Sequence, residues 1–338
     1  MQQNKWGRWG VFAFCAIWFV LTLFPLYWTL VTSFKPVLFV TSGPTYLPWI
    51  DFTPTLKPWL DAFSGERGDF VATFLNSVWI SVSASLIAVI LGSMAAYALV
   101  RFEFRVRVLS GVLFALAGIG TYVGLTQVKV GEVYAMATAF PVALAVSVIA
   151  NRFPLPGPVM KNNDVVFWFI SNRMMPPIVS AFALYMLYSK IGKEGMKMID
   201  TYWGLTICYT AFSLPLVVWL MRDFFQSLPV EVEEAALVDD VPRFRIFLEI
   251  VVPMARPGLI AVTLITLGFV WNEFLFALIL TTGDWQTLPI LLSGQNSYRG
   301  DEWWAIAVAV MIAMLPMVLI TIFLGRMMRS GLMLGSIR

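Results

Sequence analysis

Eight long apolar stretches constrain this chain more than any other feature of its sequence. A bilayer core of about 30 Å requires about 20 consecutive, mostly apolar helical residues. Stretches of roughly this kind occupy residues 9–32, 74–100, 108–126, 133–150, 165–189, 201–220, 257–280 and 303–324. Because little polar sequence separates them, the pattern predicts an all-α, polytopic membrane protein that forms a single transmembrane domain over residues 1–338.

The composition excludes several classes of function. Hydrophobic residues make up 59% of the chain and charged residues 13%, and with a mean hydropathy of +0.79 this is far from the composition of a water-soluble domain. The sequence has no histidine, and both cysteines lie within apolar stretches. We therefore expect no catalytic residues, no metal site and no disulfide framework. A net charge of +3 argues against nucleic acid, and no GxxxxGK[ST] motif is present to bind ATP.

The basic residues between the stretches predict the orientation of the chain. With a cytoplasmic N-terminus, the inner segments hold more lysine and arginine than the outer ones. This bias favours a chain with both termini in the cytoplasm. The first stretch follows Lys5 and Arg8 but has no small-residue cleavage site after it, so we expect a spanning helix rather than a cleaved leader.

The longest inner segment, residues 222–256, has the pattern of two short helices joined by a turn. Ser227 is a candidate N-cap, and Pro229 and three glutamates follow it, as at the start of a helix. A turn is expected at residues 239–242, and a second short helix at Arg243. Three glutamates and two aspartates within ten residues suit an anionic lipid surface poorly. The pattern therefore favours docking on another protein over an amphipathic helix lying on headgroups.

This segment resembles the EAA loop of ABC importer permeases, most of all those of the carbohydrate, maltose-type branch. The resemblance rests on the EEAALVD sequence of residues 233–239, on residues 250–258 and on the WNEFL sequence of residues 271–275. Further similar pieces are residues 24–35, 76–77, 95–102, 173–177, 200–202, 288–289 and 331–332, so that about 1–107 and 165–338 are covered. In one departure, Asp240 stands where the family has glycine; because Asp tolerates the left-handed conformation, we expect the turn to survive.

The resemblance implies a non-catalytic permease subunit of an ATP-driven, binding-protein-dependent importer of a sugar or polyol. It places the chain in the lipid bilayer of a bacterial inner membrane, beside a second homologous permease. The implied partners also include two ATPase subunits, which would bind ATP and Mg, and a periplasmic solute-binding protein. The alternative is a secondary, ion-coupled transporter, but only Arg173 and Glu273 are ionisable and well inside the stretches, which is little for ion coupling.

Two sets of site residues follow. The residues that the resemblance assigns to coupling with the ATPase are Glu233, Glu234, Ala235, Ala236, Asp239, Asp240 and Arg243, with both alanines facing the ATPase groove. Polar or aromatic residues within the stretches are candidates for the solute path: Asn76, Asn172, Arg173, Trp271, Asn272 and Glu273. For Glu273 and Arg173 two interpretations stay open, because the two side chains could pair to fix two helices or could line the path.

Residues 108–164 lie outside the resemblance, whose family branch has six spans. They consist of two apolar runs around a polar turn near Lys129, followed by a return to the cytoplasm through a proline-rich cluster at residues 154–158. Gly120 and Gly124 form a GxxxG step, which predicts close helix packing. We therefore expect a six-helix core with a peripheral transmembrane hairpin, about eight helices in all. A soluble insert is the alternative, but such apolar runs do not suit water.

Overall fold

The computed structural model describes residues 5–41, 45–64, 70–153, 156–294 and 303–329. Within these ranges the regular secondary structure is helical apart from one short β-ladder and one isolated bridge. Six helices are long and apolar enough to cross a membrane, or up to eight if each of two bent helix pairs is one span. The prediction of an all-α, polytopic membrane protein is therefore confirmed. Residues 331–332, which add to the family resemblance, lie outside the described ranges.

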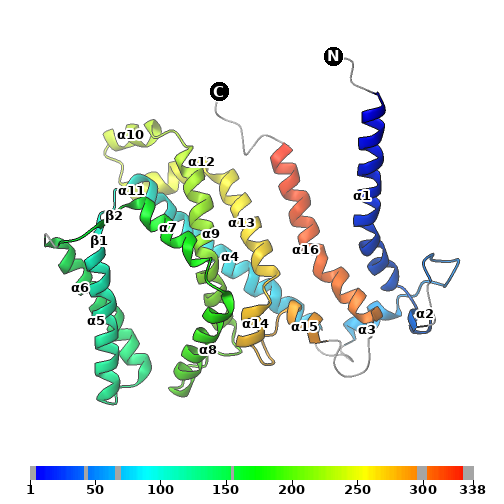
Figure 1. Ribbon diagram of the computed structural model, residues 1–338, viewed down its shortest axis with the longest axis horizontal. Coiled ribbons are helices and arrows are strands. Elements are labelled where there is room, and N and C mark those ends of the chain that lie inside the picture. The colour runs from blue at the N-terminus through cyan, green and yellow to red at the C-terminus, as the bar shows by residue number, and fades with distance from the viewer. Residues whose placement is uncertain (1–4, 42–44, 65–69, 154–155, 295–302, 330–338) are drawn as a thin grey trace. The chain divides into compact units, whose positions relative to one another are not determined.

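The chain divides into two compact units, and unit 1 comprises residues 1–75 and 287–322. Its helices are α1 (Lys5–Thr32), α2 (Val37–Thr41), α3 (Lys57–Phe63), the start of α4 (Phe70–Arg101), α15 (Leu288–Gly294) and most of α16 (Trp303–Arg329) (Figure 1). Both α1 and α16 are long and apolar enough to span a membrane, but the described chain buries none of the apolar stretch of α1. Its apolar side chains must therefore be covered by lipid or by another subunit.

Unit 2 comprises residues 76–286 and 323–338 and holds most of the buried core. After α4 come β1 (Val106–Arg107), α5 (Val108–Gln127), α6 (Glu132–Arg152), β2 (Val159–Met160), α7 (Asn162–Asn172), α8 (Pro177–Lys193), α9 (Tyr202–Gln226), α10 (Glu231–Val238), α11 (Arg243–Ile246), the π-helix η1 (Phe247–Val251), α12 (Val252–Met254), α13 (Arg256–Trp271) and α14 (Leu275–Leu280). The central helix is α9, which packs against α7, α13 and α14. It also approaches α4 closely, since a Cβ added at Gly92 would lie 2.6 Å from Val217 Cγ1.

Two stretches that the sequence predicts as continuous spans are broken in the structure. The stretch at residues 165–189 forms α7 and α8, which meet at 87°. Pro176 and Pro177 follow the end of α7, and proline restricts the residue before it to extended conformations, which ends a helix. The stretch at residues 257–280 is interrupted at residues 272–274, where α13 ends and α14 begins. Each of these two stretches therefore contains two helices rather than one.

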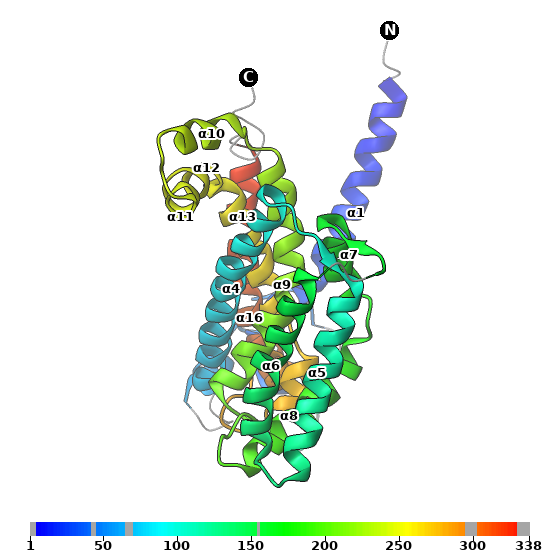
Figure 2. The same cartoon turned by 90° about the vertical axis from the view of Figure 1, so that its left-hand side faces the viewer.

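The inserted segment forms a helical hairpin in which α5 packs along α6 (Figures 1 and 2). The antiparallel strands β1 and β2 close its base. Ala135, Ala139 and Ala143 of α6 are buried, and a Cβ added at Gly118 of α5 would lie 3.4 Å from that of Ala143. By contrast, Gly120 and Gly124 have no described atom within 4 Å of an added Cβ. The predicted GxxxG contact is therefore not made within the described chain.

Candidate functional site

The predicted helix–turn–helix in the longest inner segment is present as α10 followed by α11. One detail of the prediction is wrong, because Ser227 does not start α10. It follows the last residue of α9, and its hydroxyl donates to the Phe224 carbonyl at 2.6 Å. The N-cap of α10 is Val230, which has no capping side chain, so Glu231 and its neighbouring glutamates supply the negative charge at this helix terminus.

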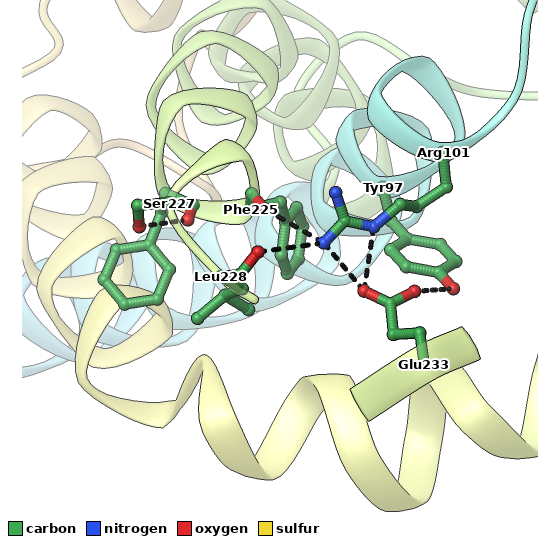
Figure 3. A network of polar contacts seen from close by, with 7 residues as sticks. Tyr97, Arg101, Phe225, Ser227, Leu228 and Glu233 are labelled. Carbon is green, nitrogen blue, oxygen red and sulfur yellow. Dashed lines mark hydrogen bonds and ion pairs between the residues drawn. The ribbon is translucent and has the colours of Figure 1, made fainter. Parts of the chain in front are cut away.

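Glu233 does not face outward from α10 but joins three helices at their ends (Figure 3). The Tyr97 hydroxyl of α4 donates to Glu233 Oε2 at 2.8 Å, and Arg101 Nε donates to Glu233 Oε1 at 2.8 Å. Arg101 Nη2 also donates to the Phe225 carbonyl at the end of α9, at 3.3 Å. We call Tyr97, Arg101 and Glu233 the Glu233 cluster. It connects α10 to the two spanning helices α4 and α9.

The Glu233 cluster is largely removed from solvent. The side chains of Arg101 and Glu233 are 13% and 8% exposed. Aromatic rings pack beside it, with the Tyr97 ring centroid 4.8 Å from that of Phe247 and 5.9 Å from that of Phe225. Removing either charge of such a pair would leave the other buried without its partner, which is costly. The ends of α4 and α9, α10 and η1 are therefore held together as one body.

The exposed face of α10 differs from the expected docking face. Ala236 is buried in the core of unit 2, so it does not face outward as expected, and Glu233 is 6% exposed. A part for either residue in coupling to an ATPase stays a prediction. Residues three apart share one face of a helix, which explains why these two turn inward together. Of the other expected coupling residues, Glu234, Ala235, Asp239, Asp240 and Arg243 are exposed. The Arg243 guanidinium lies 5.2 Å from the ring centroid of Phe102.

Asp240 ends α10 in the left-handed conformation, with φ of 56°. Its N–H donates to the Leu237 carbonyl, and the Val241 N–H donates to the Ala236 carbonyl, both at 3.1 Å. These two bonds form a Schellman motif, in which glycine is the favoured residue at this position. The expectation that the turn survives with Asp240 is confirmed.

The strain at Asp240 leads to a first prediction. Asp240→Gly should raise the stability of the purified chain by about 1 kcal/mol, because a non-glycine residue pays about that cost in the left-handed region. Asp240→Ala should lower it, since alanine keeps the strain and loses the tolerant side chain. Thermal unfolding in detergent measures both variants, and an unchanged or reversed order would contradict this account.

The candidates for the solute path lie at three places. Asn76 donates to the Asp284 carbonyl at 2.9 Å, so it ties α4 to the loop after α14. Asn172 and Arg173 are exposed at the break between α7 and α8. Trp271 is buried, whereas Asn272 is exposed at the break between α13 and α14. The Asn76 amide is therefore committed to the loop after α14, whereas the other candidates lie at the two helix breaks.

Glu273 and Arg173 do not pair with each other among the described residues. The Glu273 carboxylate instead accepts the Phe276 N–H at 3.1 Å and the Ala277 N–H at 3.4 Å, which caps the N-terminus of α14. The Arg173 guanidinium lies 5.6 Å from the ring centroid of Phe269 in α13. The break in the predicted span thus arises because Glu273 starts a new helix, and the interpretation as a helix-fixing ion pair is wrong.

A second buried carboxylate, Asp200, lies in the loop between α8 and α9. It accepts the Trp285 N–H at 3.0 Å, the Asp284 N–H at 3.1 Å and the Thr282 hydroxyl at 3.3 Å. Its own N–H donates to the Leu280 carbonyl at 2.8 Å. Burial raises the pKa of Asp200, but backbone hydrogen bonds from residues 282–285 outweigh this and hold the pKa below its ordinary value. Asp200 thus fixes the loop after α14 to the start of α9.

Sequence reasoning missed the roles of Tyr97, Arg101 and Asp200. All three fall within motifs that carry the family resemblance, but their partners lie up to 136 residues away. The available signal for the first two was their spacing, since a tyrosine and an arginine four residues apart at the end of a span share one helix face.

Comparison with known proteins gives independent evidence for the family of this chain. The family model described as "Binding-protein-dependent transport system inner membrane component" matches residues 162–332. The inner membrane ABC transporter permease protein YcjP of Escherichia coli is 29% identical, over all of both chains. The diacetylchitobiose uptake system permease protein NgcG of Streptomyces coelicolor is 29% identical, over 96% of this chain and 87% of its own. The trehalose/maltose transport system permease protein MalG of Thermococcus litoralis is 25% identical, over 94% and 92% respectively.

Proposed function

The chain belongs to the binding-protein-dependent ABC transporter inner membrane permeases, and from this premise we propose that it translocates a sugar or polyol in response to an ATPase docked on α10. The family makes it a non-catalytic, multi-pass inner membrane component of a complex with ATPase and binding-protein partners. The observation that carries the proposal is the Glu233 cluster. It gives α10 an exposed outer face on a body that includes the ends of two spans.

The proposed mechanism follows from this connection. A partner that seats against Glu234, Ala235 and Asp239 moves α10, and the buried pair of Glu233 with Arg101 passes the movement to α4 and α9. Packed elements of this kind shift between discrete arrangements rather than deforming continuously. The ATPase cycle would thereby open a central path in turn to the two sides of the membrane.

The full assembly that we propose contains a second homologous permease, two ATPase subunits with ATP and Mg, and a periplasmic solute-binding protein. Support for a further membrane subunit comes from α1, because the described chain leaves its apolar side chains uncovered. The orientation that we propose has both termini and α10 in the cytoplasm, in line with the bias of basic residues.

The substrate class is supported by relatives whose names specify diacetylchitobiose and trehalose or maltose. We place the solute path at the two helix breaks, where Asn172, Arg173 and Asn272 are exposed. Irregular backbone at membrane depth is tolerated where it is buried in protein or lines a water-filled cavity. Asn76 is left out of this path because its amide is bonded to the loop after α14.

The hairpin of α5 and α6 is proposed to be a peripheral membrane hairpin beside the core. Its buried face consists of small residues that pack α6 on α5, and its end is held to α8 by the Glu194 carboxylate, which accepts the Val133 N–H at 2.7 Å. Nothing in these contacts requires a solute.

The docking proposal predicts that Ala235→Trp abolishes uptake by the reconstituted complex while the chain still inserts into the membrane. A bulky indole on the exposed face of α10 would separate the ATPase from its seat, and a displacement of about 1 Å is enough for a large loss of activity. Uptake of labelled maltose-type sugars and co-purification of the ATPase measure the two effects.

The matched control is Ala145→Trp, which adds the same bulk to an exposed position of the hairpin and should leave uptake unchanged. Wild-type uptake by the Ala235→Trp variant would show that the docking face is elsewhere. A loss of uptake with the ATPase still bound in wild-type amount would also contradict docking at Ala235.

A further inference from the structure

Unit 1 contains a pocket of about 440 Å³ between the end of α1 and the start of α16. Nothing in the proposed coupling or solute path uses it. Its lining includes three polar side chains, Thr29, Thr32 and Lys35, of which Thr29 already donates to the Pro25 carbonyl. The indoles of Trp28 and Trp303 and aliphatic side chains such as Ile306 and Val310 complete it. The polar residues thus lie beside an apolar wall, and this arrangement suits an amphiphilic molecule.

Lys35 is a buried cation, with 2% of its surface exposed. Its Nζ lies 4.0 Å from the ring centroid of Trp28 and donates to the Thr45 carbonyl. None of the ion pairs among the described residues includes Lys35. An ammonium group has three N–H donors, so this one keeps capacity for a further acceptor. A buried charge is stable only with compensation. The Asp51 carboxylate supplies part of it through space without an ion pair, and an anion in the pocket would complete it.

Thr32 supplies a second buried polar group in the same pocket. Its side chain is 5% exposed, and Oγ1 has no hydrogen-bond partner among the described residues. The turn that ends α1 places the two residues together, since the Lys35 N–H donates to the Thr32 carbonyl at 3.1 Å. A buried hydroxyl without a partner costs free energy, so its retention points to a ligand oxygen. A hydroxyl and an ammonium on one wall are suited to a phosphate group.

We propose that this pocket binds an anionic phospholipid, with its phosphodiester at Lys35 and Thr32. The acyl chain would lie along Ile306 and Val310 of α16, and the indoles of Trp28 and Trp303 would lie at headgroup level. Free phosphate shares the anionic chemistry but leaves the aliphatic wall in water.

Lipid binding to the full chain tests the proposal. The purified protein is titrated with dioleoylphosphatidylglycerol in detergent, and bound lipid is counted by native mass spectrometry. Lys35→Gln should weaken the tightest site by about tenfold, as for the loss of one charge-assisted hydrogen bond. Lys35→Arg, which keeps the charge, should bind within about threefold of wild type. Lys57→Gln, which removes an exposed charge from the same unit, should bind like wild type.

A second variant keeps the test decisive if Lys35→Gln fails to fold. Thr32→Val preserves the branched shape, removes the hydroxyl and should weaken the site by about threefold. Equal lipid binding by wild type and a folded Lys35→Gln or Thr32→Val variant would overturn the proposal. So would displacement of the lipid by millimolar inorganic phosphate, which would assign the site to the free anion, or by maltose, which would make it a sugar subsite.

Discussion

Replacing Arg101 by alanine is expected to destabilise the junction of α4, α9 and α10 by about 3–5 kcal/mol, because it leaves Glu233 buried without its cation. The pair is short, with Arg101 Nη2 at 2.7 Å from Glu233 Oε1, and both side chains are mostly removed from water. Coupled uptake should fall below detection, whereas membrane insertion should persist. Thermal unfolding of the purified complex and uptake in proteoliposomes measure the two effects.

A matched exposed pair lies four residues further along the chain. Arg105 Nη2 is 3.1 Å from Glu103 Oε2, but these side chains are 75% and 83% exposed. Arg105→Ala should therefore cost no more than about 1 kcal/mol and leave uptake unchanged. Equal losses from Arg101→Ala and Arg105→Ala would show that burial of the Glu233 cluster is not what matters.

The coupling role can be separated from stability by replacing both charges. The double variant Arg101→Met with Glu233→Met removes the buried charges together, and such replacements are often neutral or stabilising. If the ion pair transmits movement, this variant should unfold near the wild-type temperature but hydrolyse ATP without matching uptake. Wild-type coupling in the double variant would reduce the Glu233 cluster to a structural role.

Asp200→Ala is expected to cost about 2–3 kcal/mol, because the N–H groups of Asp284 and Trp285 lose their acceptor. The pKa of Asp200 is held below its ordinary value of 3.8, so its charge stabilises the folded protein above that pH. This contribution is lost as the pH falls through the lowered pKa and the carboxylate takes up a proton. Asp200→Ala should therefore flatten the acid dependence of the unfolding temperature as the pH falls below 3.8.

Two comparisons check the Asp200 assignment. Asp200→Asn keeps one oxygen acceptor but cannot ionise, so it should lose less stability than Asp200→Ala and show the same flattened pH dependence. Asp223→Ala, at an exposed aspartate, should change stability by less than about 0.5 kcal/mol. An Asp200→Ala variant with the full acid dependence of wild type would place that dependence on other groups.

Local sequence patterns predicted most of the elements of this protein. The apolar runs at residues 9–32 and 303–324 became α1 and α16, and the acid-rich segment became α10, with its turn at Asp240. These features depend on hydrophobicity over 20 residues, on helix-terminus charge and on the tolerance of single residues for left-handed backbone. All of these act over a few residues, so the chain displays them directly.

The site required contacts that no local pattern contains. Glu233 lies 132 residues from Arg101 in the chain, and helical spacing alone could not show that this glutamate turns inward while Glu234 remains exposed. The break at Glu273 was hidden for the same reason, since its carboxylate is committed to the N–H groups of α14 rather than to Arg173. The sequence by itself determined that the chain is a helical membrane permease with an acid-rich segment of two short helices. Tertiary structure decided which charged groups hold that segment to the spans, because pairing of buried charges depends on which helix ends meet in space.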